Sequence, residues 1–330
     1  MELKEFKNIL CKFPRVELGI TPTPIHRLKN MEKKTKHNPI YIKRDDLNGI
    51  GIGGNKLRGL EYLFGDAITK NMDTIIASGQ IQSNMCSLAA AACRYANLNC
   101  VIVHNNDKPN KLEGNAILNN LLKPNIRYVG EMDEFKRAEE VEKIKEELIK
   151  EGKKPYIILN GTSTPLGCLG YVSLAIEFYE QIKKENLNIK NVCIPGGNGG
   201  LAAGLIYGVA ILGRPFHLDL ITVEHEKNHL QNIIEAFIRE LEKLVGIEFP
   251  YELDEVVTIH DEYRDGGWGV ISDEVANFIY EFAQTEGIFV EKVYTCKTIY
   301  GMNDMLKKRY FKSGVCFYHS GGIGALFSQY

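Results

Sequence analysis

The sequence lacks a long apolar run, an excess of either charge and any C-x-x-C pair of cysteines. Its longest run of small apolar residues, around 88–92, is far too short for a bilayer, so we expect no membrane partner. The net charge is −2, with basic and acidic residues interspersed, so we expect no nucleic-acid partner. The segment MELKEFKNIL is charged where a secretory signal has its apolar core, and the eight scattered cysteines are typical of reduced thiols. These features predict a cytoplasmic protein.

The 330 residues, 44% of them apolar, are enough to bury a sizeable core and normally divide into two domains. Short apolar segments alternate with amphipathic ones, which predicts an α/β fold with parallel or mostly parallel sheets flanked by helices. We expect strands at 40–43, 74–77, 100–103, 126–129, 156–159, 192–194, 218–223 and 315–318. We expect helices at 57–70, 83–96, 114–122, 133–151, 168–184, 200–211, 229–244, 271–286 and 298–309.

The most highly charged of these helices lies in the run EMDEFKRAEEVEKIKEELIKEGKK. Phe135, Ala138, Val141, Ile144 and Leu148 recur there at intervals of three and four residues. This spacing predicts one apolar stripe and a solvated opposite face. We interpret the run as an ordinary surface helix and not as a charged interaction module.

Glycine-rich segments follow four of the expected strands, namely GIGGNK, ASGQIQSNM, IPGGNGGLAAGL and HSGGIGAL. In open α/β sheets, ligands bind at the carboxyl ends of strands, where helix N-termini present free amide groups to anions. A tight turn needs one glycine and not several. The four segments therefore predict one shared ligand site between two sheets.

The segment GIGIGGNKLRGLEYL, residues 49–63, leads through glycines to Lys56. A nucleotide-binding P-loop needs a lysine directly after its last glycine, followed by a hydroxyl for magnesium. Here Asn55 follows Gly54, and Leu57 follows the lysine, so the spacing disfavours a P-loop. Two interpretations remain open on the segment alone: Lys56 is the reagent of the site, or it is a solvated lysine at the start of a helix.

A second pattern, His225-Glu226-Lys227-Asn228-His229, matches the zinc-protease motif H-E-x-x-H. That chemistry requires both histidines on one face of a continuous helix. The motif begins where an expected strand ends, so His225 is expected to precede the helix. We therefore predict no metal site, and zinc proteolysis is kept as an alternative.

Six segments in unbroken order resemble one family from about residue 12 to the end of the sequence. They are KRDDLNGIGIGGNKLRGLEYL, SGQIQSNM, GTSTPLGCLGY, GGNGGLAAGL, EGIFVEKVYTCKTIYGM and HSGG. They resemble the pyridoxal-phosphate enzymes of the D-cysteine desulfhydrase and 1-aminocyclopropane-1-carboxylate (ACC) deaminase group, which have the tryptophan-synthase-β fold (fold type II). The resemblance implies pyridoxal 5′-phosphate as cofactor, a small amino acid as substrate and a homodimer. It also implies a large cofactor-binding domain of residues 1–58 and 169–330, a small domain of residues 59–168, and a cleft between them.

By this resemblance Lys56 forms the Schiff base with the cofactor aldehyde. An amine nucleophile must be partly unprotonated, which burial in a water-poor cleft achieves by lowering its pKa. The segment 197–200 matches the phosphate-binding loop, whose amide donors suit a dianion at a helix N-terminus. Its members are Gly197, Asn198, Gly199 and Gly200.

The resemblance assigns further roles around the cofactor. Asn84 matches the residue that hydrogen-bonds the cofactor's ring oxygen. Ser83 and Tyr294 match side chains beside the substrate, which are candidates for proton transfer and for contacting the substrate carboxylate. Thr295 stands at the position that is associated with the pyridine nitrogen.

Five positions depart from the family pattern. Met85 replaces a histidine or glutamine after the Q-S-N motif, and Gly59 replaces a lysine that often follows the arginine of N-K-x-R. Leu201 replaces a threonine that often ends the phosphate loop. Trp268 replaces a tyrosine that faces the substrate, and Ser320 replaces a threonine but keeps a hydroxyl. The cofactor site survives these changes, whereas Met85 and Trp268 leave the identity of the substrate open.

The choice of reaction depends on Thr295. In the ACC deaminases a glutamate follows the active-site tyrosine, whereas a threonine stands there in the D-cysteine desulfhydrases. A neutral hydroxyl need not protonate the pyridine ring, which favours prompt loss of a β-leaving group. We therefore predict a lyase that converts D-cysteine to pyruvate, hydrogen sulfide and ammonia, with Lys56 as the base. ACC deamination or elimination from another β-substituted amino acid is the alternative, and a non-catalytic protein that binds pyridoxal phosphate and amino acids is the alternative of another class.

Overall fold

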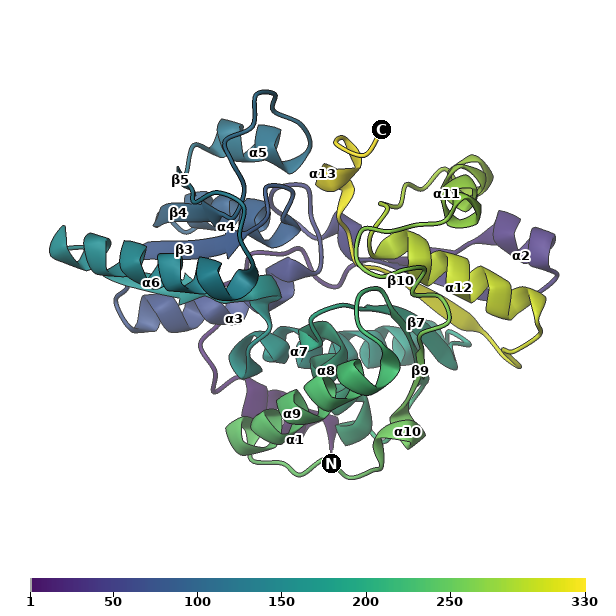
Figure 1. Ribbon diagram of the computed structural model, residues 1–330. Helices are drawn as coiled ribbons and strands as arrows, with labels where there is room; N and C mark the ends of the chain where they lie inside the picture. The colour runs from purple at the N-terminus through teal and green to yellow at the C-terminus, as the bar shows by residue number, and fades with distance from the viewer. Residues whose placement is uncertain (1) are drawn as a thin grey trace.

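Two β-sheets form the framework of the computed structural model, which describes residues 2–330 apart from the side chain of Asn160 (Figure 1). The six-stranded sheet has the order β1-β2-β10-β7-β8-β9, and the four-stranded sheet has the order β5-β4-β3-β6. Neighbouring strands are parallel except β1 and β2, which pair antiparallel at the edge of the larger sheet. The larger sheet comprises β1 (Ile25–Arg27), β2 (Ile40–Arg44), β7 (Asn191–Gly196), β8 (His217–Thr222), β9 (Val257–His260) and β10 (Val315–His319). The smaller comprises β3 (Thr74–Gly79), β4 (Asn99–His104), β5 (Asn125–Tyr128) and β6 (Pro155–Ile158).

Helices flank both sheets (Figure 1). Those before β7 are α1 (Leu3–Leu10), α2 (Lys29–Thr35), α3 (Lys56–Thr69), α4 (Asn84–Tyr95), α5 (Asn115–Leu122), α6 (Glu134–Lys150) and α7 (Pro165–Glu185). Those after it are α8 (Gly200–Ile211), α9 (Lys227–Val245), α10 (Leu253–Val256), α11 (Asp273–Glu286), α12 (Thr295–Lys307) and α13 (Ile323–Leu326). Two 3₁₀ turns, η1 (Asp45–Leu47) and η2 (Asn160–Thr162), complete the elements.

The centre of the larger domain is the packing of α8 against α7. All twelve residues of α8 are buried, and glycines on one of its faces let the two helices approach closely. A Cβ on Gly204 would lie 2.3 Å from the Cys168 carbonyl oxygen, and one on Gly208 would lie 2.6 Å from Ala175 Cβ. This packing holds the N-terminus of α8 at the carboxyl end of β7, because displacing a fully buried and closely packed helix would leave voids.

The alternation of apolar and amphipathic segments predicted most of this architecture. Each of the eight expected strands and nine expected helices corresponds to an observed element, and the fold type II α/β architecture with two mostly parallel sheets is confirmed. The short elements β1, β9, α1, α2, α10 and α13 and the two 3₁₀ turns were missed. All four strands of the smaller sheet fall within residues 59–168, while the domain boundaries themselves stay a prediction. Among the helices of residues 2–330, no apolar stretch reaches the length that a bilayer requires.

The predicted apolar stripe of α6 is wrong at its first two positions. Phe135 is 77% exposed and Ala138 is also exposed, whereas Arg137 is buried. The buried face of α6 runs Arg137, Val141, Ile144 and Leu148, with spacings of four, three and four residues. The charged residue was assigned to the solvated face because periodicity counts only apolar side chains.

Candidate active site

Two hollows share four lining residues where the loops of the two sheets meet. The shared residues are Lys56, Asn84, Asn198 and Tyr294. The narrower hollow, about 50 Å³, lies among residues 54–56, 197–202 and 320–322, and we call it the cofactor pocket. The wider hollow, about 550 Å³, extends from there to residues 79–85 and 132–137 on the smaller sheet and to Trp268, and we call it the cleft.

Lys56 stands at the first position of α3, where two glycine-rich loops touch. The Asn55 amide donates to the Ser320 carbonyl oxygen at 2.9 Å. A Cβ on Gly321 would lie 2.7 Å from Gly54 Cα, so the two loops can approach only because residue 321 is glycine. Both residues also have positive φ angles, which favour glycine. The glycines before Lys56 therefore allow the contact between the two loops. This contact positions Lys56 at the edge of the cofactor pocket.

The amine of Lys56 has no acidic partner within ion-pair distance among the described side chains, and it donates to the Gly161 carbonyl oxygen at 2.9 Å. Burial lowers the pKa of Lys56 to about 8, against a smaller opposing effect of Cys168. A substantial fraction of the amine is therefore neutral near physiological pH, as a nucleophile or general base requires.

The N-terminus of α8 forms a cradle of backbone amides. Gly199 caps this helix with φ 82° and no side chain satisfies its first amides. A Cβ on Gly199 would lie 2.5 Å from Ile233 Cγ2, and one on Gly200 would lie 2.9 Å from Ser163 Oγ. Only glycine fits both positions, and Ser163 closes the cradle from the opposite side, so a compact anion has several donors available there.

Asn84 is oriented by a neighbour that sequence reasoning did not identify. Its side-chain oxygen accepts a hydrogen bond from Asn115 Nδ2 at 2.7 Å, which leaves its own amide nitrogen as a donor toward the pocket. Asn115 is itself fixed by two hydrogen bonds to Gln82. Ser83 caps α4, where its hydroxyl accepts from the Cys86 amide at 3.3 Å and is still able to donate toward the cleft.

Tyr294 and Trp268 form one wall of the cleft. The indole Nε1 of Trp268 lies 3.1 Å from the Tyr294 hydroxyl oxygen, and burial raises the pKa of Tyr294 to about 12. The loop that carries Trp268 is held by Lys297, whose ammonium group donates to the carbonyl oxygens of Arg264 and Gly267. The tyrosine therefore stays protonated at neutral pH and keeps a hydroxyl in the cleft.

Thr295 is fully buried and does not line either hollow. Its hydroxyl lies 3.1 Å from Glu291 Oε1, and the Glu291 carboxylate also accepts from the amides of Val293, Tyr294 and Thr295. The structure therefore brings Ser320 into the cofactor pocket, and it places Thr295 behind the wall. Glu291, which the sequence did not single out, fixes the start of α12 and with it the backbone of Tyr294.

Met85 has a buried side chain that packs in the hydrophobic core of the smaller sheet and also borders the cleft. Gly59, where the family often has a lysine, faces Thr162: a Cβ there would lie 2.6 Å from Thr162 Oγ1. The space that a longer side chain would need is already filled in this chain. Leu201 borders the cofactor pocket with an apolar side chain.

A buried ion network supports Lys56 from behind. Arg58 donates to Asp45 at 2.6 and 2.8 Å and to Glu177 Oε2 at 2.8 Å, and Lys43 also donates to Glu177. Burial alone would raise the pKa of Glu177, but the pairing with Arg58 and Lys43 outweighs it and lowers that pKa to about 2. The network locks the first turn of α3 onto β2 and α7.

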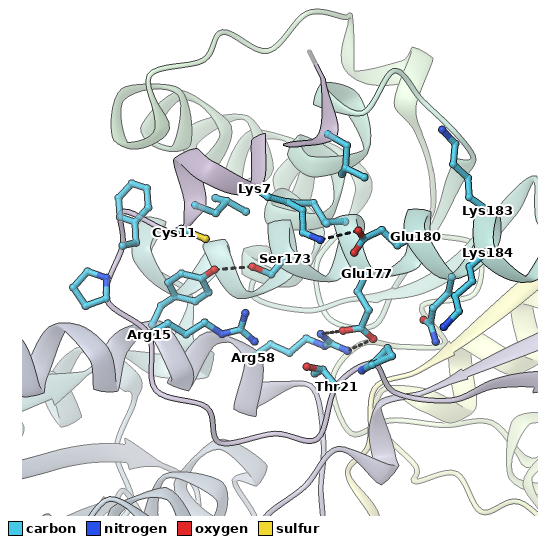
Figure 2. Close-up of a pocket in the computed structure, with 18 of the residues that line it drawn as sticks. Lys7, Cys11, Arg15, Thr21, Arg58, Ser173, Glu177, Glu180, Lys183 and Lys184 are labelled. Carbon is cyan, nitrogen blue, oxygen red and sulfur yellow. Dashed lines mark hydrogen bonds and ion pairs between the residues drawn. The ribbon is translucent and has the colours of Figure 1, made fainter. Parts of the chain in front are cut away.

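Arg58 and Glu177 also border a different cavity of about 1120 Å³, between α1, the segment 11–22 and α7 (Figure 2). It is larger than the cleft, but it contains none of the predicted site residues. Several of its charged groups are already paired, including Lys7 with Glu180 and Arg15 with Glu61. We therefore place the active site in the cofactor pocket and the cleft.

The alternative zinc motif does not have the required geometry. α9 begins at Lys227, so His225 precedes the helix that carries His229. The two imidazole rings lie 4.7 Å apart and contact each other. No group of three or more potential metal ligands occurs among the side chains that the structure describes.

The observed residues fit a flat phosphorylated aldehyde. The amide cradle of α8 suits its phosphate, and the Asn84 amide and the Lys56 amine border the same pocket. Ser320 adds a neutral hydroxyl to the lining. A two-sheet α/β fold with a lysine and an anion cradle at the meeting of the sheets defines the class: pyridoxal-phosphate enzymes of fold type II.

Comparison with known proteins agrees with this class. The family model described as "Pyridoxal-phosphate dependent enzyme" matches residues 16–321. A protein of Pyrococcus horikoshii named "Putative 1-aminocyclopropane-1-carboxylate deaminase" is 35% identical over 97% of this chain and 95% of its own length, and one of the same name from Thermotoga maritima is 32% identical over 96% and 98%. A crystal structure of an ACC deaminase homologue superimposes with a TM-score of 0.89 at 34% identity, covering 99% of this chain and 97% of that one.

The processed form of threonine deaminase isoform 2 from Solanum lycopersicum shares the fold, with a TM-score of 0.64 at 17% identity over 97% of this chain and 84% of that one. The chain belongs to the pyridoxal-phosphate-dependent enzymes, in the group that contains the ACC deaminases and D-cysteine desulfhydrases.

Proposed function

We propose that this enzyme is a lyase that carries out β-elimination on a small amino acid, with D-cysteine as the first candidate. The observation that carries the proposal is that no acidic side chain is among the described residues that line the cofactor pocket, where Ser320 supplies a hydroxyl. Thr295 occupies the sequence position at which ACC deaminases have a glutamate, and the nearby Glu291 carboxylate is occupied by four donors. A neutral partner does not hold a proton on the pyridine nitrogen, which favours prompt departure of a good leaving group.

Bound pyridoxal phosphate supplies an electron sink for the negative charge that forms at the substrate Cα. In our proposal Lys56 binds the cofactor covalently and then takes the Cα proton, since its pKa of about 8 leaves it partly neutral. The amides at the start of α4, beside Ser83, and the hydroxyl of Tyr294 hold the substrate carboxylate. The Cβ–S bond breaks with its electron pair on sulfur, so D-cysteine and water give pyruvate, hydrogen sulfide and ammonia.

ACC deamination is the second candidate, and the names of the relatives favour it. It would convert ACC and water to 2-oxobutyrate and ammonia. Opening a cyclopropane requires a stronger electron sink than loss of a thiolate, and this is why the neutral surroundings of Ser320 support elimination in our proposal. The amino-acid substrate, the homodimer and the domain boundaries remain proposals that rest on the family resemblance.

The decisive experiment is a panel of D- and L-cysteine, D- and L-β-chloroalanine and ACC with the purified holoprotein. Keto acid, ammonia and sulfide are measured, with Lys56→Ala as the inactive control. We expect pyruvate and sulfide in equal amounts from D-cysteine and no 2-oxobutyrate from ACC. Turnover of ACC without sulfide from D-cysteine would favour the second candidate. Amino acids that change the absorption of the bound cofactor but yield no product would indicate a binding protein.

A further inference from the structure

Arg137 occupies a position in the buried stripe of α6 where an apolar side chain is expected. It is only 5% exposed and lies on the same helical face as Val141 and Ile144. It also lines the cleft, together with Ser83 at the start of α4. The core of α6 therefore begins with a cation that faces the substrate space.

The guanidinium group is poorly satisfied. Nη1 donates to Asn105 Oδ1 at 2.9 Å, Nε is buried without a hydrogen-bond partner, and no hydrogen bond of Nη2 occurs within the described side chains. The ion pairs of α6 that the structure describes join other side chains. Two acids border the same wall, but Asp133 Oδ1 accepts from the Lys136 amide, and Glu134 has an interaction of its own.

A buried cation without a counterion is costly, because desolvation is not offset by an ion pair. Arg58 is another buried arginine of this chain, and its charge is balanced by two carboxylates, those of Asp45 and Glu177. In the part of the chain that the structure describes, Arg137 has no such carboxylate and instead lines a hollow that a ligand enters. An anion in the cleft would supply the missing partner and would match the fork of the guanidinium.

The backbone places this cation near the reaction centre. β3 and β4 are paired with Gly79 opposite His104, so Gln80 and Asn105 leave the sheet side by side. Ser83, at the start of α4, lies three residues after Gln80, and Asn105 holds Arg137. If the α4 amides take the substrate carboxylate, the guanidinium is left to bind a second anionic group of the same small molecule.

We propose that Arg137 binds a negatively charged β-substituent, so that the substrates include amino acids that carry an anionic leaving group such as a phosphate or a sulfinate. This inference rests on the proposed β-elimination and extends its substrates beyond D-cysteine. For O-phosphoserine, Lys56 takes the Cα proton, and the Cβ–O bond breaks with its electron pair on the phosphate oxygen. O-Phosphoserine and water then give pyruvate, ammonia and inorganic phosphate.

The test compares O-phosphoserine with β-chloroalanine, whose β-substituent is uncharged, using both enantiomers and the holoprotein. Arg137→Gln should lower kcat/KM for O-phosphoserine by about 10- to 100-fold, the range of a charge-assisted hydrogen bond, and should change that for β-chloroalanine less than about threefold. Arg127→Gln is the matched control, because Arg127 is a partly exposed arginine of β5 outside the cleft. Arg137→Lys keeps the charge and should retain part of the preference, and it replaces the glutamine variant if that variant does not fold.

A second readout is the concentration of O-phosphoserine that produces half of the change in the absorption of the bound cofactor. It should rise by the same factor in Arg137→Gln and stay constant in Arg127→Gln. An equal loss of kcat/KM for both substrates would overturn the inference, because it would assign Arg137 to the carboxylate that both substrates share. Unchanged kcat/KM for both substrates would overturn it as well. If wild-type protein turns over neither substrate, the β-elimination fails, while the absorption titration still decides whether Arg137 binds the anion.

Discussion

The indole Nε1 of Trp268 donates a hydrogen bond to the hydroxyl oxygen of Tyr294, 3.1 Å away. The two residues are 26 positions apart and belong to a loop and a helix N-terminus that meet only in the folded chain. Trp268 is 44% exposed and lines the cleft, while its ring nitrogen is held by this hydrogen bond. Trp268 is therefore part of the cleft wall, and its hydrogen bond orients the Tyr294 hydroxyl.

Replacing Trp268 with Phe should lower kcat/KM for the preferred amino acid by about tenfold, because one hydrogen bond that orients Tyr294 is lost. Steady-state kinetics measures this, with Tyr280→Phe on the exposed face of α11 as control. Unchanged kinetics in Trp268→Phe would show that Tyr294 needs no orientation.

Trp268 is also the only tryptophan, so tryptophan fluorescence reports on the cleft alone. Adding pyridoxal phosphate to the apoprotein should quench this emission strongly, because the cofactor pocket adjoins the cleft that Trp268 borders. A saturating amino acid should then change it again. Emission that does not respond to the cofactor would place the cofactor elsewhere.

The amine of Lys56 should control the pH dependence of cofactor binding. Its pKa is lowered to about 8 by burial, and only the neutral amine reacts with an aldehyde. The rate at which apoprotein develops the absorption of bound cofactor should rise about tenfold per pH unit below 8 and level off above it. A midpoint near 10.5, the ordinary lysine value, would contradict the buried environment.

The ion network behind Lys56 should contribute to stability in a defined pH range. The pKa of Glu177 is about 2 in the folded protein, below its ordinary value of 4.5, so the contribution is complete above about pH 4.5 and is lost as the pH falls toward 2. Glu177→Gln should lower the free energy of unfolding by about 3–5 kcal/mol at pH 7, because Arg58 and Lys43 lose a buried partner. The difference from wild type should shrink near pH 3. Urea unfolding at both pH values measures it, and a constant difference would contradict the assignment.

The close contact between Gly59 and Thr162 should limit which side chains residue 59 can carry without loss of stability. Gly59→Ala should cost about 1–3 kcal/mol of stability, because its Cβ would lie 2.6 Å from Thr162 Oγ1. The same change should cost much less when Thr162, which has a positive φ of 61°, is replaced by glycine. Unfolding free energies of the four proteins in this cycle give the coupling, and an additive result would show that the site relaxes without strain.

Sequence patterns predicted the features that depend on neighbouring residues and missed those that depend on distant contacts. The long strands and helices were predicted because their apolar periodicity is local, whereas β1 has three residues and α2 has one buried residue, Met31, so neither shows a period. The loops of the site were found because their glycines are conspicuous. Asn115 and Ser163 were missed because their partners lie far away in the sequence. Arg137 was missed for the opposite reason: its helix has a strong pattern, and a buried cation violates it.

The most direct test of the account is the identity of the lysine that binds the cofactor. Holoprotein is treated with borohydride, which fixes the cofactor to its lysine, and the labelled peptide is sequenced by mass spectrometry. We predict a single label at Lys56. The Lys56→Ala variant should carry no label and should not be yellow. A label at another lysine, such as Lys292 at the edge of the cleft, or a colourless protein that does not take up pyridoxal phosphate, would contradict it.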